Sequence, residues 1–148
     1  MRPLDLVIVG GGLAGGLCAL ALRRCRPDLR LLLVEPGKVI GGNHLWSFFE
    51  SDIRPDHRWL TDPLVRHRWP AYDVHFPAHS RHLDQTYQTI ESEALDQAVR
   101  AALAPEEIRA ATVSELGATH VLLSGGERIE AAAVLDARGG KAEGLDLG

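Results

Sequence analysis

A glycine-rich turn between an apolar run and a helical pattern constrains the fold of this chain more than any other feature. Residues 4–9 (LDLVIV) are typical of a short strand that is buried on both faces. They lead into residues 10–15 (GGGLAG), which match G-x-G-x-x-G, and residues 13–25 carry the apolar stripe of a helix with arginines near its end. A second apolar run at residues 30–35 (RLLLVE) completes a strand–helix–strand unit.

The same stretch has a competing interpretation as a signal peptide or membrane span. Residues 6–22 are uncharged and rich in leucine, valine and alanine. However, five glycines interrupt them, Asp5 abuts the run and only Arg2 could form a basic leader. A strand, a glycine turn and a helix explain this pattern better.

Each position of the glycine motif has a physical role in binding a dinucleotide. Gly10 permits the tight turn, and Gly12 allows a pyrophosphate to approach the backbone N–H groups of Leu13 and Ala14 at the helix start. Gly15 allows the helix to pack close to the strand. The acidic residue that should bind ribose hydroxyls is Glu35, which also disfavours NADP because it would repel a 2′-phosphate. The alternative is a purely structural glycine turn with a surface glutamate.

Two later segments favour FAD over NAD. Pro36 opens a glycine-bearing loop at residues 36–43, and residues 135–139 (LDARG) resemble the second FAD motif of the glutathione-reductase-like superfamily. A simple NAD-binding domain would instead continue with alternating strands and helices. We therefore predict an α/β, Rossmann-type FAD-binding domain of that superfamily.

The rest of the chain is predicted in less detail. All eight aromatic residues fall between positions 46 and 87, in a stretch without helical period. There we expect loops with short strands, at residues 73–76 and 85–89. A helix is predicted at residues 92–103 with Ser92 as its N-cap, followed by a strand at 108–113 and a hairpin of residues 119–124 and 128–135.

Charge and composition exclude several functions. The 148 residues suffice for one domain, and a net charge of -4 gives no basic field for nucleic acid. Cys18 and Cys25 lie too far apart on one helix for a disulfide, so a reducing cytoplasm is expected. The seven histidines lack the spacing of a metal site, and we predict none.

Residues 41–48 (GGNHLWSF) resemble the GGNHTWSF segment of bacterial lycopene β-cyclases, with Leu45 in place of the usual threonine. Similar stretches occur along nearly the whole chain, including His57-Arg58-Trp59, residues 67–70 and the LDARG segment. The resemblance implies redox-neutral cyclisation of the ψ-end groups of lycopene, giving γ- and then β-carotene, with reduced FAD and NADPH as its electron source. It also implies a peripheral position on the cytoplasmic face of the cell membrane. Further cofactor contacts would come from Gly42, Asn43, His44, Val113, Asp136, Ala137, Arg138 and Gly139, and the substrate pocket from Trp46 and Phe48.

Cyclases of this family are well over twice as long as this chain. We therefore expect residues 1–148 to be the amino-terminal FAD-binding part of a longer enzyme, with residues 43–88 as an inserted segment that contributes to a substrate domain. The catalytic acid is expected beyond residue 148, so the chain alone should be inactive. Two alternatives stay open: another FAD-dependent oxidoreductase or monooxygenase acting on an apolar isoprenoid, and a non-catalytic nucleotide-binding module.

Overall fold

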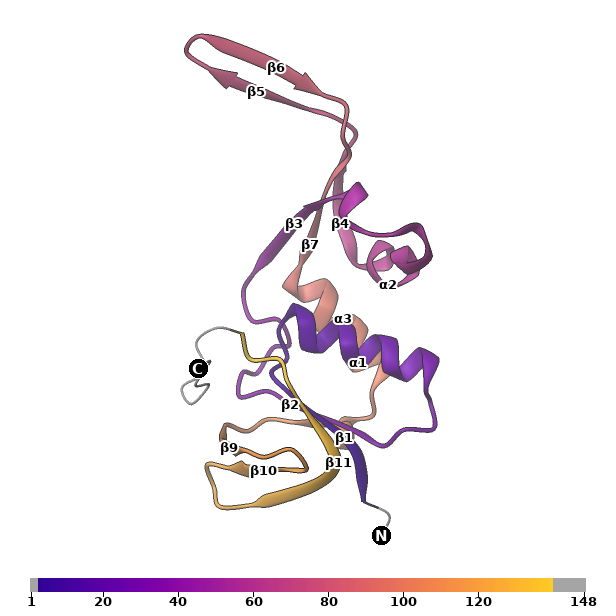
Figure 1. Cartoon of the computed structure of the whole chain (residues 1–148), viewed down its shortest axis with the longest axis vertical. Helices are drawn as coiled ribbons and strands as arrows, with labels where there is room; N and C mark the ends of the chain where they lie inside the picture. The colour runs from indigo at the N-terminus through magenta and orange to yellow at the C-terminus, as the bar shows by residue number, and fades with distance from the viewer. Residues whose placement is uncertain (1–2, 140–148) are drawn as a thin grey trace.

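The computed structural model describes residues 3–139, which form a large mixed sheet, two helices packed against it, a smaller sheet and a projecting hairpin (Figure 1). The strands are β1 (Leu4–Val9), β2 (Leu31–Val34), β3 (Leu45–Phe49), β4 (Val65–Trp69), β5 (Tyr72–Phe76), β6 (His79–Leu83), β7 (Tyr87–Glu91), β8 (Ile108–Arg109), β9 (Val113–Leu116), β10 (His120–Leu123) and β11 (Arg128–Asp136). The helices are α1 (Leu13–Cys25), α2 (Arg58–Thr61) and α3 (Ser92–Ala102), with short 3-10 turns at Glu50–Asp52, Pro55–His57, Asp62–Leu64 and Pro105–Glu107.

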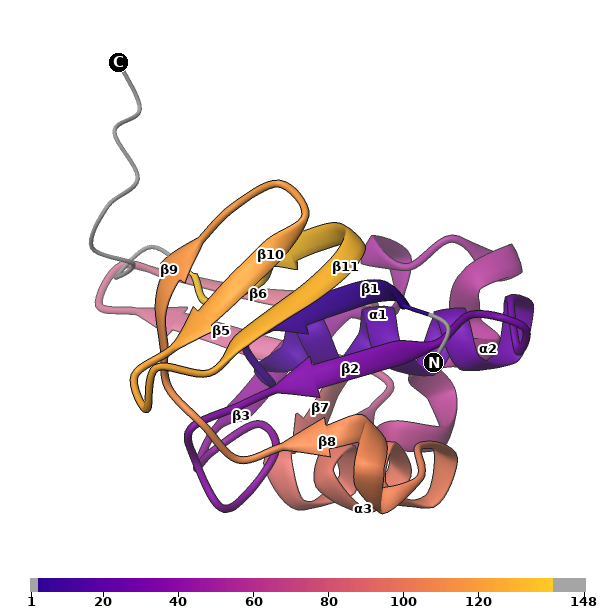
Figure 2. The same cartoon turned by 90° about the horizontal axis from the view of Figure 1, so that it is seen from below.

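The large sheet has the strand order β8-β2-β1-β11-β10-β9. Its first four strands run parallel, and β10 pairs antiparallel with both β11 and β9. The last strand in sequence, β11, therefore lies in the middle of the sheet, between β1 and β10 (Figure 2). Val9 is level with Val34 on one side and with Asp136 on the other, so three parallel strands end together.

Apolar side chains fill both faces of this sheet, as expected for strands such as β2, all four of whose residues are buried. One core cluster lies between the sheet, α1 and α3 and includes Ile8, Leu33 and Leu95. The other includes Val7, Val34 and Val121, on the face over which β9 and β10 fold. Burial on both faces makes the sheet a rigid support for the segments at its edge.

The segment between β2 and α3 builds the second layer. Strands β3, β7 and β4 form a three-stranded antiparallel sheet, and β5 pairs with β6 in a hairpin that extends away from the rest of the chain (Figure 1). Trp46 and Phe48 point from β3 into the core cluster beneath α1 and α3. This sheet is therefore anchored on one face by the same core that supports the large sheet.

Several predicted elements are confirmed, and others are wrong. The first strand and helix have the predicted bounds, and the second strand, the strand at 73–76, the helix at 92–103 and the hairpin at 119–135 are present. The strand at 108–113 is wrong, because the chain leaves β2 after Arg109 and Val113 already belongs to β9. Ser92 is not the N-cap, since α3 begins at that residue after Glu91 and the Ser92 N–H donates to the His44 carbonyl at 3.0 Å.

Candidate cofactor site

The carboxyl ends of β1, β2 and β11 meet at one edge of the large sheet. The Gly10 N–H donates to the Val34 carbonyl at 2.8 Å, and the Ala137 N–H donates to the Val9 carbonyl at 2.8 Å. These bonds extend the sheet by one step, so the turn after β1 lies between the segments that follow its two neighbours. In open parallel sheets, ligands bind at this edge.

The three motif glycines differ in how closely other atoms surround them. Gly10 has a φ of +103°, and a Cβ there would lie 2.8 Å from the Ala137 carbonyl oxygen. A Cβ on Gly15 would lie 1.9 Å from the Gly10 carbonyl oxygen, so α1 approaches the turn as closely as glycine allows. A Cβ on Gly12 would meet nothing within 4 Å. The turn is thus closed by the chain's own packing at Gly10 and Gly15, and open at Gly12, where α1 begins.

Glu35, directly after β2, holds this turn in place. One carboxylate oxygen accepts the Gly11 N–H at 2.7 Å, and the other accepts the Gly37 N–H at 2.8 Å. The Gly41 N–H in turn donates to the Gly11 carbonyl at 2.7 Å. Each carboxylate oxygen keeps a further lone pair, so Glu35 can accept additional hydrogen bonds while it fixes the loop after β2. The sequence predicted the acceptor role of Glu35 but not this bracing role.

These segments surround a groove of about 720 Å³, which we call the cofactor groove. It is lined by Val9, Gly10, Gly12, Val34, Glu35, Pro36, Gly41, Gly42, His44, Ala111, Thr112, Val113, Ser114, Ser124, Ala137 and Arg138. Nine of the sequence-predicted cofactor residues are among them. Gly41, which has a φ of +83°, was not predicted as a site residue. Its only sequence signal is its place in a Gly-Gly pair. Thr112, Ser114 and Ser124 were not predicted either, and the Ser124 N–H donates to the Thr112 carbonyl at 2.9 Å, which joins the segments on either side of the β9–β10 pair.

The other predicted site residues lie outside the lining of the groove. Leu13, Trp46 and Phe48 line a separate cavity of about 460 Å³ between α1 and β3. Asn43 is exposed on the loop before β3, Gly139 follows β11 with a φ of +76°, and Ala14 and Gly15 lie in the first turn of α1.

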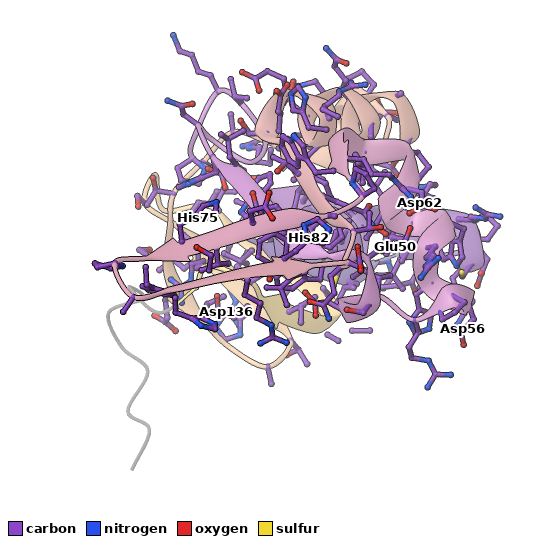
Figure 3. The ribbon with its side chains drawn as sticks, turned by 90° about the horizontal axis from the view of Figure 1, so that it is seen from above. Glu50, Asp56, Asp62, His75, His82 and Asp136 are labelled. Carbon is purple, nitrogen blue, oxygen red and sulfur yellow. The ribbon has the colours of Figure 1, made fainter. Side chains whose placement is uncertain are left out.

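Asp136 forms a bidentate ion pair with Arg138 at the end of β11. Both guanidinium contacts, from Nε and from Nη2, are 2.8 Å long, and each side chain keeps 27% of its surface exposed. The hydrogen bonds from Arg138 lower the pKa of the Asp136 carboxyl. Asp136, labelled in Figure 3, lies at the carboxyl end of β11 in register with Val9, and Arg138 itself lines the groove. This pair therefore holds the Arg138 guanidinium in a fixed position beside the groove, with its charge balanced by Asp136.

Within residues 3–139, no three His, Cys, Asp or Glu side chains gather as a metal site would require. In the same part of the chain, no helix is both long and apolar enough to cross a bilayer.

The fold and the groove together define a mixed α/β domain of the Rossmann type. Solved structures share this fold at low sequence identity. A peptidyl tryptophan dihydroxylase, QhpG, is 20% identical with a TM-score of 0.63, over 95% of this chain and 33% of its own. The tetrameric 2-methyl-3-hydroxypyridine-5-carboxylic acid oxygenase is 17% identical with a TM-score of 0.69, over 90% and 39% of the two chains. A Photorhabdus luminescens protein described as an FAD-containing monooxygenase is 15% identical with a TM-score of 0.60, again over 90% and 39%.

The chain belongs to the lycopene cyclase protein family, which matches residues 5–147. It is 48% identical over 136 residues to a lycopene beta-cyclase of Pseudescherichia vulneris, and 42% identical over 141 residues to one of Pantoea ananas. These alignments cover 91% and 94% of this chain but 35% and 37% of the relatives. The chain thus spans about a third of the length of the curated relatives it matches.

Proposed function

We propose that this chain is the FAD-binding part of a lycopene β-cyclase. The observation that carries the proposal is membership of the lycopene cyclase family over residues 5–147, with 48% identity to a named lycopene beta-cyclase. The reaction proposed is the cyclisation of the ψ-end groups of lycopene to β-rings in carotenoid biosynthesis. A proton adds to a terminal alkene, the neighbouring alkene closes the ring, and a proton leaves, so the substrate gains and loses no electrons.

The residues of the cofactor groove fit a flavin dinucleotide. The space beside Gly12 is open to a ligand, and α1, which is 13 residues long, begins there with free backbone N–H groups suited to a pyrophosphate. Glu35 has lone pairs left for ribose hydroxyls, and Arg138 at the end of β11, ion-paired with Asp136, adds guanidinium N–H donors along the groove. When bound, reduced FAD supplies negative charge near the site where the carbocation develops.

In this proposal, residues of this chain bind the cofactor, fix its orientation and exclude a cofactor that carries a 2′-phosphate. Glu35 selects a ribose without a 2′-phosphate by repulsion, and the closed packing at Gly10 and Gly15 fixes where the diphosphate can lie. Among residues 3–139 we assign no proton donor. NADPH as the electron source and a place on the cytoplasmic face of the membrane belong to the same proposal, and they rest on the family resemblance alone.

A chimera tests the activity. This chain would replace its matching segment in the Pseudescherichia vulneris relative, in cells that accumulate lycopene. We expect γ- and β-carotene by chromatography, whereas the 148-residue chain alone should leave lycopene unchanged. A folded chimera that leaves lycopene untouched would contradict the proposal. An oxygenated carotenoid would instead favour a flavin-dependent monooxygenase.

Titration of the full 148-residue chain with FAD tests the groove. The variant Gly12→Val fills the open space at the start of α1, and we expect the Kd for FAD to rise about tenfold, which corresponds to about 1.4 kcal/mol. Gly125→Val is the matched control, because a Cβ at Gly125 also meets nothing within 4 Å and the residue does not line the groove. Equal FAD affinity in both variants would place the cofactor elsewhere or favour a module that binds no flavin.

A further inference from the structure

The sheet β3-β7-β4 has two faces of different character. Trp46 and Phe48 point into the core cluster beneath α1 and α3. The opposite face, which we call the aromatic face, follows from the alternation of side chains and the strand register. It carries Leu45, Ser47 and Phe49 from β3, Tyr87, Thr89 and Glu91 from β7, and His67 and Trp69 from β4.

At the end of this face where Phe49, Tyr87 and Trp69 pair, the aromatic rings form a continuous strip. Phe49 and Trp69 both pair in register with Tyr87, with ring centroids 5.2 Å and 6.1 Å from the tyrosine ring. Tyr72, at the start of β5, stacks on Phe49 at 5.7 Å and lies 6.3 Å from Tyr87. His67 extends the strip by stacking on Trp69 at 5.9 Å. Such distances are typical of aromatic rings in attractive contact.

Apolar surface on this face is open to a ligand. Trp69 is 46% exposed and Leu45 is 69% exposed, so both ends of the face present apolar surface to solvent. Phe49, Tyr72, Tyr87 and Ser47 line a cavity of about 480 Å³, together with Phe48 and Asp52. The Asp52 carboxylate accepts the Phe49 N–H at 2.9 Å, so its charge is partly satisfied by the backbone. The cavity therefore offers ring surfaces beside one carboxylate that is tied to the backbone.

The aromatic face also connects to the cofactor groove. Leu45 begins β3 directly after His44, which lines that groove, and Leu45 pairs with Glu91. The His67 ring contacts the Glu91 carboxylate at 3.1 Å. The face thus has Glu91 and an exposed leucine at the end nearest the groove, His67 in the middle, and the rings of Phe49, Trp69 and Tyr87 at the far end. A long apolar molecule lying along β3 would place one end toward the cofactor.

We propose that the ring strip Phe49, Trp69, Tyr72 and Tyr87, and not Trp46 and Phe48, is the surface on which a conjugated polyene stacks. This inference rests on the proposed function and deepens it by naming the substrate subsite. An extended conjugated hydrocarbon is flat and uncharged, so it gains dispersion contacts with ring faces and removes exposed apolar surface from water. Trp46 and Phe48 point to the opposite face of β3, where they pack against the core cluster and line the separate cavity of about 460 Å³ beside α1.

Binding of parinaric acid, a linear conjugated tetraene, to the full 148-residue chain tests the subsite through the emission of the probe itself. Trp69→Ser combined with Tyr72→Ser should raise the apparent Kd about tenfold, because two aromatic contacts at about 0.5 to 1.5 kcal/mol each are lost. The control Phe76→Ser removes a ring that is 64% exposed on the distant hairpin, and it should leave the Kd within about twofold. Trp46→Leu, which keeps apolar packing, should also bind like the unaltered chain.

Circular dichroism on each variant verifies that it folds. The inference is overturned if the double variant binds the tetraene like the unaltered chain, if Trp46→Leu alone abolishes binding, or if stearic acid competes as well as the tetraene binds. The chimera separates this result from the proposed function. If the chimera with the unaltered chain makes cyclic carotenes and the double variant makes them at the same rate, only the subsite fails. If the chimera with the unaltered chain makes none while the ring strip still binds the tetraene selectively, the cyclase proposal fails.

Discussion

At the residue scale, Glu35 combines two roles in one carboxylate. It accepts the N–H groups of Gly11 and Gly37 and so joins the glycine turn to the loop after β2. Glu35 also lines the cofactor groove. A residue expected from sequence to touch only a ligand is therefore also part of the frame that shapes the site. Substitutions at Glu35 should change stability even when no cofactor is bound.

Glu35→Gln tests this double role. Glutamine presents only one acceptor oxygen, so one of the two backbone N–H groups faces an amide nitrogen and loses its bond. We expect the free energy of unfolding of the FAD-free chain to fall by about 1 to 2 kcal/mol in urea denaturation. We also expect FAD affinity to fall about tenfold. The control Glu106→Gln alters an exposed glutamate outside the groove and should change neither quantity. Unchanged unfolding in Glu35→Gln would remove the bracing role.

His82 on β6 should titrate above its ordinary value. Its Nδ1 contacts Asp73 at 2.8 Å and its Nε2 contacts Asp84 at 3.0 Å, and Figure 3 shows His82 on the projecting hairpin. The hydrogen bond with Asp73, followed by that with Asp84, raises the pKa of His82 above its ordinary 6.5. A raised pKa in the folded state means that the contribution to hairpin order is fully present below pH 6.5. This contribution is lost as the pH rises through the higher folded-state pKa.

Nuclear magnetic resonance of the His82 ring measures this shift directly. Asp73→Asn should bring the midpoint back toward its ordinary value by more than Asp84→Asn does, because Asp73 is the larger cause. As His82 loses its proton, the hydrogen-exchange rates of the backbone amides in β5 and β6 should increase by more than the intrinsic effect of pH on exchange. Identical midpoints in the unaltered chain and in both variants would show that neither carboxylate holds the imidazolium.

At the element scale, adjacent glycines on α1 should respond differently to alanine. A Cβ on Gly15 would lie 1.9 Å from a backbone oxygen, whereas a Cβ on Gly16 would lie 2.9 Å from the Leu95 side chain. Backbone at the strand end cannot move without breaking the turn, but a leucine can shift at a smaller cost. We expect Gly15→Ala to lower the free energy of unfolding by about 3 kcal/mol. Gly16→Ala should lower it by less than about 1 kcal/mol, since helix propensity offsets part of the strain. An equal loss in the free energy of unfolding for the two variants, measured by denaturant titration, would contradict this packing.

The same scale shows what the sequence could predict. The glycine turn, α1 and the two flanking strands were predictable because continuous apolar runs and glycines encode them locally. Strands β3 and β4 were missed because their residues alternate little, and they become strands through pairing with β7, whose residues lie about 40 and 20 positions away in the chain. The groove residues Thr112, Ser114 and Ser124 had no signal, since the pairing of β9 with β10 and the bond from the Ser124 N–H to the Thr112 carbonyl bring them together.

At the scale of the whole molecule, the strands contribute unequally to the stability of the fold. Strand β11, the last in sequence, pairs with β1 over residues 4–9 and with β10, and it carries the segment that closes the cofactor groove. Within residues 3–139, by contrast, β5 pairs with β6 alone, and this hairpin extends away from both sheets (Figure 1). Removing the hairpin should therefore leave the fold intact, whereas removing β11 should disrupt it. Both deletions leave α1 and the glycine turn in the chain.

Two deletions measured side by side test this. Tyr72 and Leu83 face each other in register, so residues 73–82 can be replaced by Asn-Gly, which favours a two-residue hairpin turn. Cooperative unfolding should persist with a Tm within about 3 °C, and the Kd for FAD should stay within about twofold. A chain that ends at residue 127 loses the middle strand and exposes the edges of β1 and β10, so it should lose cooperative unfolding and FAD binding together. If the shortened chain still binds FAD like the full chain, the end of β11 has no part in the site. If the Asn-Gly variant unfolds without cooperativity, the hairpin stabilises the fold through contacts beyond its own two strands.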